Sequence, residues 1–200
     1  MTTKKFLLLF LLVLTGCASA PPSNHNDICT IFLEKPGWYK SAVKSAAKWG
    51  GPLHVPMAIM YQESSFKRDA KPEMQYFLGV VPTGRKSDAY GYSQALKSTW
   101  KRYKRETGAN YKQRDNFAAA YDFIQWYMHT TYKANGVSKW DTYAQYLNYH
   151  EGQGGYARGS YRNKQWLMNT ARRVSDRATR YGKQMQTCKA ELEKKNRGWF

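Results

Sequence analysis

The sequence predicts an all-α fold in a single domain. Apolar residues recur at spacings of three and four along most of the chain, which is the period of an amphipathic helix. No run alternates between apolar and polar residues as convincingly as a half-buried strand would. Glycine and proline separate the helical runs, and the chain of 200 residues is long enough for one hydrophobic core.

The first helix is expected over residues 38–49, directly before the helix breakers Gly50-Gly51-Pro52. A short and mostly apolar helix follows from Pro56, whose missing N–H is no loss in a first helical turn. Residues 67–92 show no sustained period, and a loop of that length in a compact domain is usually functional.

Later helices are expected between further helix-breaking glycine and proline residues and helix-capping residues. They cover residues 93–108, a stretch from an N-cap at Asp115 or Asn116 to Asn135, a stretch from Ser138 to the glycine-rich turn 152–155, and the region from about Lys164. In two of them Leu96 and Trp140 are expected to point inward. The last helix carries the longest apolar stripe: Leu167, Ala171, Val174, Ala178, Tyr181, Met185, Cys188 and Leu192.

The N-terminus has the pattern of an export signal. Lys4 and Lys5 precede a short apolar run, residues 6–14, which is too short to span a bilayer. The following Leu14-Thr15-Gly16-Cys17 resembles the lipobox of bacterial lipoproteins, in which the cysteine becomes the lipidated first residue. Cleavage of an ordinary signal near Ala18 or Ala20 is the alternative. Because residue 18 is not aspartate, the resemblance implies an anchor at the periplasmic face of the outer membrane.

Four segments follow from these boundaries. Residues 1–16 are a lipoprotein signal peptide, and residues 17–28 are the lipidated cysteine with a flexible tether rich in serine, proline and asparagine. Residues 29–192 form the domain, and residues 193–200 form a basic tail. Beyond the signal, Cys29 and Cys188 are the two remaining cysteines, and an even pair in an exported protein predicts one disulfide.

The chain is strongly basic. Its formal net charge is +18, or +16 without Lys4 and Lys5, which favours anionic partners. Export argues against nucleic acid, so the charge is interpreted as attraction to cell wall or membrane, with general solubility as the alternative. The four histidines lack the spacing of metal ligands, so neither a metal nor another cofactor is expected.

Glu63 is the most informative single residue. In a helix, Ile59 and Met60 lie on its face, so the carboxyl would lose hydration and its pKa would rise. A glutamic acid with a raised pKa can donate a proton near neutral pH. The alternative is a glutamate at a frayed helix end that points into water.

Three segments resemble the signatures of the soluble-lytic-transglycosylase-type (SLT) domain of the lysozyme-like superfamily. They are Glu63-Ser64-Ser65-Phe66, Gly91-Tyr92-Ser93-Gln94 and the run from Tyr149 to Gly155, in the same order as the family's Glu-Ser-x-Phe, Gly-Leu-Met-Gln and Ala-Tyr-Asn-Ala-Gly. The resemblance implies a lysozyme-like helical domain with an active-site cleft. It also implies a lytic transglycosylase that cuts peptidoglycan between N-acetylmuramic acid and N-acetylglucosamine without water and leaves a 1,6-anhydro ring.

The resemblance also implies residue roles. Glu63 matches the only catalytic residue of the family, an acid and then a base. Ser64, Gln94 and Tyr149 match residues that support the glutamate or contact substrate, and each could instead be a cap, a surface amide or a core aromatic residue. The sequence departs from the family at Tyr92-Ser93 and at His150-Glu151, so Tyr92 and His150 are further candidates for substrate binding. An ionised Glu151 near Glu63 would raise its pKa further.

Two other functions remain open. A hydrolytic muramidase would use Glu63 with an activated water, and a catalytically inactive lipoprotein would only bind peptidoglycan. Asp69, Glu73, Asp88 and Glu151 are the carboxyls that could accompany Glu63. Of the aromatic residues that could stack on sugar rings, only the loop residues Tyr90 and Tyr156 are proposed for that role. The protein is expected to act as a monomer on glycan strands.

Overall fold

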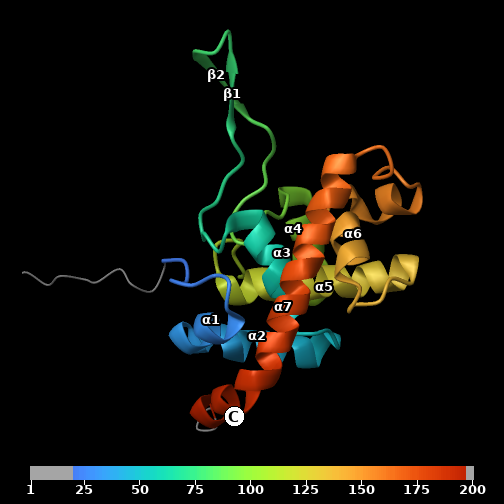
Figure 1. Ribbon diagram of the computed structural model, residues 1–200. Helices are drawn as coiled ribbons and strands as arrows, with labels where there is room; N and C mark the ends of the chain where they lie inside the picture. The colour runs from blue at the N-terminus through green and yellow to red at the C-terminus, as the bar shows by residue number, and fades with distance from the viewer. Residues whose placement is uncertain (1–19, 197–200) are drawn as a thin grey trace, which may run out of the picture.

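The computed structural model describes residues 20–196, which contain seven helices and one small sheet (Figure 1). The predicted signal peptide and the predicted lipidation site Cys17 lie outside the described residues. The all-α prediction is confirmed. The helices are α1 (Ile28–Glu34), α2 (Pro36–Trp49), α3 (His54–Ser64), α4 (Lys97–Thr107), α5 (Phe117–Asn135), α6 (Thr142–Ala157) and α7 (Gln165–Asn196).

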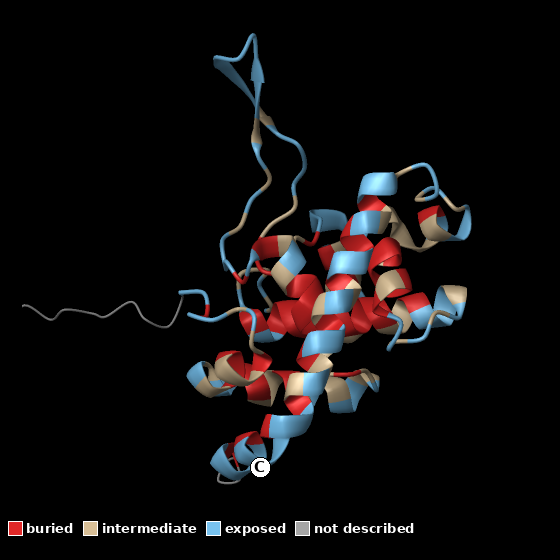
Figure 2. Ribbon diagram, viewed as in Figure 1, coloured by how far each residue is buried: buried red, intermediate tan, exposed pale blue. Residues whose placement is uncertain are grey.

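Helix α5 lies at the centre of the fold, and α2, α3, α4 and α6 pack against it. Most of its side chains are buried on all sides, which agrees with its mainly apolar sequence (Figure 2). The long helix α7 runs across α1, α3 and α6 and buries the whole stripe predicted from Leu167 to Leu192. Within residues 20–196, no helix has the length and apolar character needed to cross a membrane.

The segment expected to be a plain loop contains a β-hairpin, so the prediction of no strands is wrong there. Strand β1 (Met74–Phe77) pairs antiparallel with β2 (Val81–Arg85). Three residues, 78–80, connect the strands. Leu78 and Gly79 have positive φ, 52° and 75°, at the two central positions of the turn that the Val80 N–H closes on the Phe77 carbonyl at 3.2 Å. The sequence signal was hidden because leucine stands where asparagine or aspartate is usual. Apolar residues also lie on both faces of the strands, so no alternation is visible.

Two residues expected to point inward are exposed. Leu96 is the N-cap of α4 and has 43% of its surface exposed, because the helix begins at Lys97 rather than near Ser93. Trp140 is 62% exposed and precedes α6, whose N-cap is Asp141. The glycine-rich turn expected at 152–155 lies inside α6, where Gly152 (φ 75°) introduces a kink.

The end segments are more ordered than predicted. Of the expected flexible tether, residues 20–27 pack on the body, and α1 begins at Ile28. The His25 ring stacks on Tyr61 of α3 with 4.9 Å between centroids, and the Arg177 guanidinium donates to the His25 carbonyl at 3.0 Å. At the other end, Glu193–Asn196 continue α7 instead of opening a tail, and Asn196 is buried.

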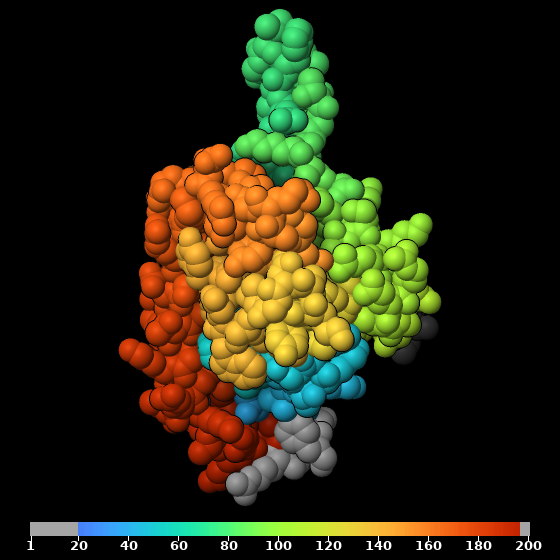
Figure 3. Space-filling view, turned by 90° about the vertical axis from the view of Figure 1, so that its right-hand side faces the viewer, coloured from blue at the N-terminus to red at the C-terminus, as the bar shows by residue number. Residues whose placement is uncertain are grey.

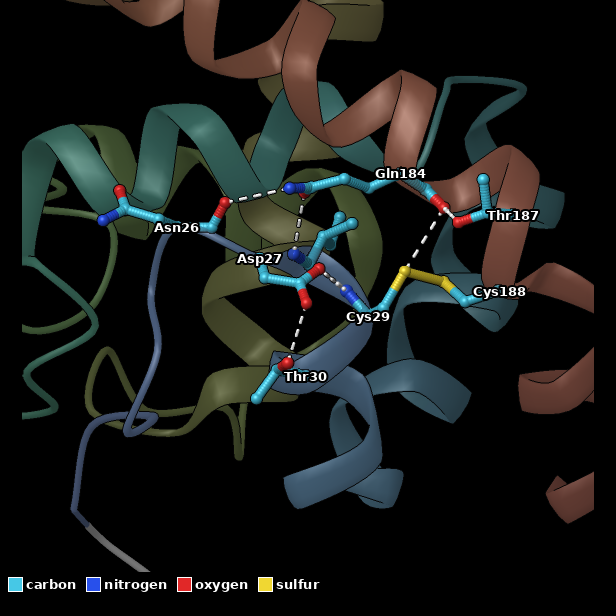
Figure 4. Close-up of a disulfide and its surroundings, with 8 residues drawn as sticks. Asn26, Asp27, Cys29, Thr30, Gln184, Thr187 and Cys188 are labelled. Carbon is cyan, nitrogen blue, oxygen red and sulfur yellow. Dashed lines mark hydrogen bonds between the residues drawn. A yellow bond between two sulfur atoms is a disulfide. The ribbon is translucent and has the colours of Figure 1, made fainter.

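The predicted disulfide is confirmed. Cys29 of α1 is bonded to Cys188 of α7, with 5.9 Å between their Cα atoms (Figure 4). Neighbouring contacts hold the same two helices together: the Gln184 side-chain oxygen accepts from the Ile28 N–H at 3.1 Å, and Asp27 caps α1 by accepting from the Cys29 N–H at 3.0 Å. The first and last helices of the fold are therefore joined covalently.

Replacing both cysteines with serine is expected to lower the free energy of unfolding by about 2–4 kcal/mol, because the crosslink closes a long loop in the unfolded chain. Denaturant unfolding of the oxidised wild type and of Cys29→Ser/Cys188→Ser would measure the difference. Reduced wild type serves as the matched control and should resemble the variant. Equal unfolding midpoints for oxidised wild type and the variant would contradict the prediction.

Candidate active site

Glu63 lies in the last turn of α3, a helix that is apolar on nearly every side. Met57, Ile59 and Met60 are fully buried, and they hold the helix in the core. The half-buried Glu63 side chain thus stands where a buried helix reaches the surface. This placement agrees with the expectation of a carboxyl on an apolar face rather than at a frayed, solvated end.

The backbone is strained around the first two motifs. Four non-glycine residues among those described have positive φ, and three belong to these motifs: Ser65 (49°), Phe66 (61°) and Gln94 (47°). Such conformations cost roughly 1–3 kcal/mol each and persist only where surrounding structure enforces them. Phe66, fully buried against Trp38 and Tyr61, supplies that enforcement directly after Glu63.

Burial raises the pKa of Glu63 to about 7. A hydrogen bond from the Tyr146 hydroxyl acts in the opposite direction, because it stabilises the carboxylate and lowers this pKa. Near neutral pH the group is therefore divided between its acid and base forms. Among the described residues, no other carboxyl contributes to the shift.

Ser64 and Gln94 fasten the first two motifs together. The Ser64 hydroxyl is buried, 2.8 Å from the Tyr92 carbonyl and 3.1 Å from the Met60 carbonyl. The Gln94 amide nitrogen donates to the carbonyls of Ala70 and Gly91, each at 2.9 Å. Both side chains therefore position the segments that flank Glu63.

Gly91 in the second motif cannot be replaced without moving the backbone. Its φ is +77°, and a Cβ atom built there would lie 2.2 Å from the carbonyl oxygen of Arg114. Only glycine combines this conformation with so close an approach. The motif glycine is therefore explained by packing against the segment that leads into α5.

Tyr92 and Ser93, which replace the apolar residues of the family motif, are buried. The Tyr92 ring is 4% exposed and packs on Trp38 and Phe117, with centroid distances of 5.7 and 5.8 Å. The Ser93 hydroxyl is buried without a hydrogen-bond partner among the described residues. Tyr92 thus contributes its ring to the core and its carbonyl to Ser64.

Tyr149 brings the third motif to the other two. Its hydroxyl donates to the Ser93 carbonyl at 2.6 Å, and its ring packs edge-on against Tyr127 at 5.1 Å. Burial raises the pKa of Tyr149 well above its usual value, and the neighbouring charge of Glu63 raises it further. The structure therefore gathers the three sequence motifs around one carboxyl.

His150 and Glu151 face elsewhere. The Glu151 carboxylate accepts from Lys164 Nζ at 2.8 and 2.9 Å and from the Ser160 hydroxyl, and His150 Nδ1 lies 3.0 Å from it. Burial alone would raise the pKa of Glu151, but these hydrogen bonds lower it to about 2. The expected repulsion between Glu151 and Glu63 is wrong, because Glu151 is committed to the connection between α6 and α7. The exposed His150 packs edge-on against Trp166 at 5.1 Å.

Tyr146 is the site residue that sequence reasoning missed. It was one of several aromatic residues at helical spacing, and such residues are most often core. The available signal was its position three residues before Tyr149, which places both hydroxyls on one face of α6. Burial and the Glu63 charge both raise the pKa of Tyr146, so it remains a hydrogen-bond donor at every physiological pH.

Tyr146→Phe is expected to raise the pKa of Glu63 and to move the alkaline limb of the activity profile to higher pH. The reason is that the lost hydrogen bond favours the carboxylate. Loss of this charge-assisted bond should also reduce kcat by about tenfold or more. Rate measurements on isolated peptidoglycan across pH would test both effects. Tyr143→Phe, one turn earlier on α6, is the matched control, and an unmoved limb in Tyr146→Phe would contradict the assignment.

Comparison with known proteins identifies the family. The family described as the transglycosylase SLT domain matches residues 5–188, which include all three motifs. No curated protein and no solved structure matches the chain. The helical fold and the clustering of the three motifs agree with the family match. The chain belongs to the SLT-domain family of transglycosylases that act on peptidoglycan.

Proposed function

We propose that this protein is a lytic transglycosylase that cleaves the β-1,4 bond between N-acetylmuramic acid and N-acetylglucosamine and forms 1,6-anhydro-N-acetylmuramic acid. Glu63 is the acid and then the base. The observation that carries the proposal is the position of the half-buried Glu63 carboxyl in a site formed by all three motifs, where burial raises its pKa to about 7. A group with this pKa can give and take one proton within a single turnover near neutral pH.

The reaction needs one proton and returns it. Protonated Glu63 donates to the glycosidic oxygen as the bond to C1 of the muramyl sugar breaks. The sugar's own N-acetyl oxygen stabilises the positive charge that develops at C1. The Glu63 carboxylate then removes the proton of the C6 hydroxyl while O6 bonds to C1. Because the nucleophile belongs to the substrate, a second protein carboxylate is not required, unlike in ordinary glycosidases.

Tyr146 and burial have opposing effects that suit this cycle. Burial favours the protonated acid that starts the reaction, and the Tyr146 hydrogen bond stabilises the carboxylate formed after the first step. Ser64, Gln94 and Tyr149 act as positioning residues through their bonds to the Tyr92, Gly91 and Ser93 carbonyls. His150, exposed beside Trp166, is proposed as a contact for the glycan strand or its peptides.

Product analysis distinguishes this function from the alternatives. Purified protein is incubated with isolated peptidoglycan, and the soluble products are identified by mass spectrometry. Anhydro-muropeptides are expected. Reducing muramyl ends would instead assign a hydrolytic muramidase with the same Glu63. Binding of peptidoglycan without release of products, from a folded protein, would assign an inactive wall-binding lipoprotein.

We also propose that Cys17 is lipidated and holds the enzyme at the periplasmic face of the outer membrane. The lipobox-like Leu14-Thr15-Gly16-Cys17 and the basic surface support this location. Protein extracted from membranes is expected to begin with an acylated Cys17 by mass spectrometry. A mature N-terminus at Ala18 or later would contradict the proposal.

A further inference from the structure

The tip of the β-hairpin is a concentrated apolar surface. Five of the ten large hydrophobic residues that are exposed in the described part of the chain lie between Tyr76 and Val81. Leu78 is 81% exposed and Val80 is 75% exposed. Figure 3 shows the hairpin standing clear of the helical body, so none of this surface is covered by the rest of the fold.

The tip is apolar on both faces. The register pairs Tyr76 with Pro82 and Phe77 with Val81. Since paired residues share a face and neighbouring residues alternate, the first pair lies on one face and the second pair on the other. Leu78 closes the turn between them. A groove on another protein covers one face of a hairpin, whereas the interface of a lipid bilayer surrounds an inserted element.

Polar and charged residues begin directly behind the tip. The strand ends carry Gln75 and Thr83, and then Arg85 and Lys86. Arg85 donates to the Pro72 carbonyl at 2.5 Å, and Lys86 pairs with Glu73 at 2.7 Å. Three strand residues span about 10 Å, which is close to the depth of about 5–10 Å that amphipathic elements reach in a membrane interface. The basic residues would then lie at the level of anionic headgroups.

The proposed lipid anchor places the body close to a membrane, and this step rests on the lipidation of Cys17. Two residues lie between Cys17 and Ala20, so three Cα–Cα steps give a reach of at most about 11 Å. Ala20 begins a segment that packs on α3 through the stack of His25 on Tyr61. Helix α3 in turn leads through Ser65 and Phe66 into the first limb of the hairpin. The segment that begins at Ala20 and the hairpin therefore both adjoin the last turn of α3.

We infer that the hairpin tip, residues 76–82, inserts into the interface of an anionic phospholipid bilayer and forms a second membrane contact beside the lipid anchor. The two contacts together would fix the orientation of Glu63 relative to the membrane.

A fluorescent label at the tip tests insertion directly. The protein is produced from Ala18, without the signal peptide and Cys17, because the acyl chain would otherwise bind by itself. Leu78→Cys carries an environment-sensitive nitrobenzoxadiazole label, and Cys29 and Cys188 do not react because they are disulfide-bonded. Vesicles of phosphatidylethanolamine and phosphatidylglycerol should shift its emission to the blue. The matched control carries the same label at Trp140→Cys. Residue 140 is also exposed but lies outside the hairpin, before α6, so the emission of its label should not shift.

Vesicle binding of a tip variant provides the second readout. Phe77→Ser/Leu78→Ser should weaken co-sedimentation with these vesicles by about tenfold or more, and Trp140→Ser should not. Unchanged binding of the tip variant, or vesicle binding with no spectral shift at residue 78, would overturn the inference. Loss of a dimer in sedimentation equilibrium, or loss of peptidoglycan binding, without a membrane effect would assign the tip to a second copy or to glycan. Cleavage of isolated peptidoglycan by the tip variant separates this result from the catalytic proposal, because it should continue at the wild-type rate.

Discussion

Glu63→Gln is expected to reduce the release of anhydro-muropeptides by about a thousandfold or more. Glutamine has nearly the same shape but can neither donate the first proton nor accept the second, and each general acid–base role contributes about 10²–10⁴ in rate. Time courses with isolated peptidoglycan, analysed by mass spectrometry, would measure the loss. Equal release by wild type and variant would remove Glu63 from the mechanism.

The same substitution should stabilise the fold at alkaline pH. The pKa of Glu63 is about 7 in the folded protein and 4.5 in the reference state, so folded protein binds more protons between these values. The free energy of unfolding therefore falls as pH rises from 4.5 to 7. Glutamine carries no charge and escapes this loss. The expected gain is at most about 3 kcal/mol, reduced by the partial solvent access of the half-buried group.

Thermal unfolding at two pH values provides the control for the activity experiment. At pH 8 the Glu63→Gln variant should unfold at a higher temperature than wild type, and at pH 4 the two should agree, because Glu63 is then protonated. A variant that is less stable than wild type at pH 8 would show that Glu63 also holds structure together. The loss of activity could then not be attributed to proton transfer alone. The strained backbone of Ser65 and Phe66, directly after Glu63, also lowers the stability of the fold. Like the buried carboxyl, it is a feature of the site that costs stability.

The three- and four-residue spacing of apolar residues predicted the helices that pack against the core along their full length. The α7 stripe and the Asn116 cap could be recognised because each depends on neighbours in the sequence. Leu96 and Trp140 were misplaced because helix starts depend on local caps and turns that periodicity does not encode. The hairpin was missed for a related reason. Nearly all residues of its two strands are exposed, so no buried face leaves a pattern in the sequence.

Site residues that belong to a sequence motif could be predicted, whereas site residues that are brought in by tertiary packing could not. Glu63 and Tyr149 follow from residue order, and the structure brings them together. The bond from Tyr146 to Glu63 depends on how α6 is placed relative to α3, which the spacing of Tyr146 and Tyr149 does not fix by itself. Glu151 was misjudged because its partner Lys164 follows after a turn of unknown direction. Contacts that form only through tertiary packing are thus the ones that could not be predicted from the sequence.

Asp122 is expected to be the most costly acidic residue to remove for stability. Its carboxylate accepts hydrogen bonds from Ser45 at 3.0 Å, Trp49 Nε1 at 2.8 Å, Tyr103 at 2.5 Å and Lys112 Nζ at 2.7 Å. These donors come from α2, α4 and the segment before α5, so one group on the central helix joins three parts of the fold. Asp122→Ala would leave four donors without their acceptor, at a cost of about 3–5 kcal/mol.

The pH dependence of this loss distinguishes Asp122 from Glu63. Burial alone would raise the pKa of Asp122, but the hydrogen bonds from Lys112, Tyr103 and Trp49 outweigh it and lower the pKa below 3.8. Its contribution to stability is therefore present above pH 3.8 and is lost as pH falls through the lowered folded-state value. Denaturant unfolding of wild type and Asp122→Ala should differ fully at pH 7 and less at strongly acidic pH. Asp122→Asn, which keeps one acceptor oxygen, should fall between them. A difference below about 1 kcal/mol at pH 7 would show that water can replace the carboxylate, because unsatisfied buried donors would cost more than that.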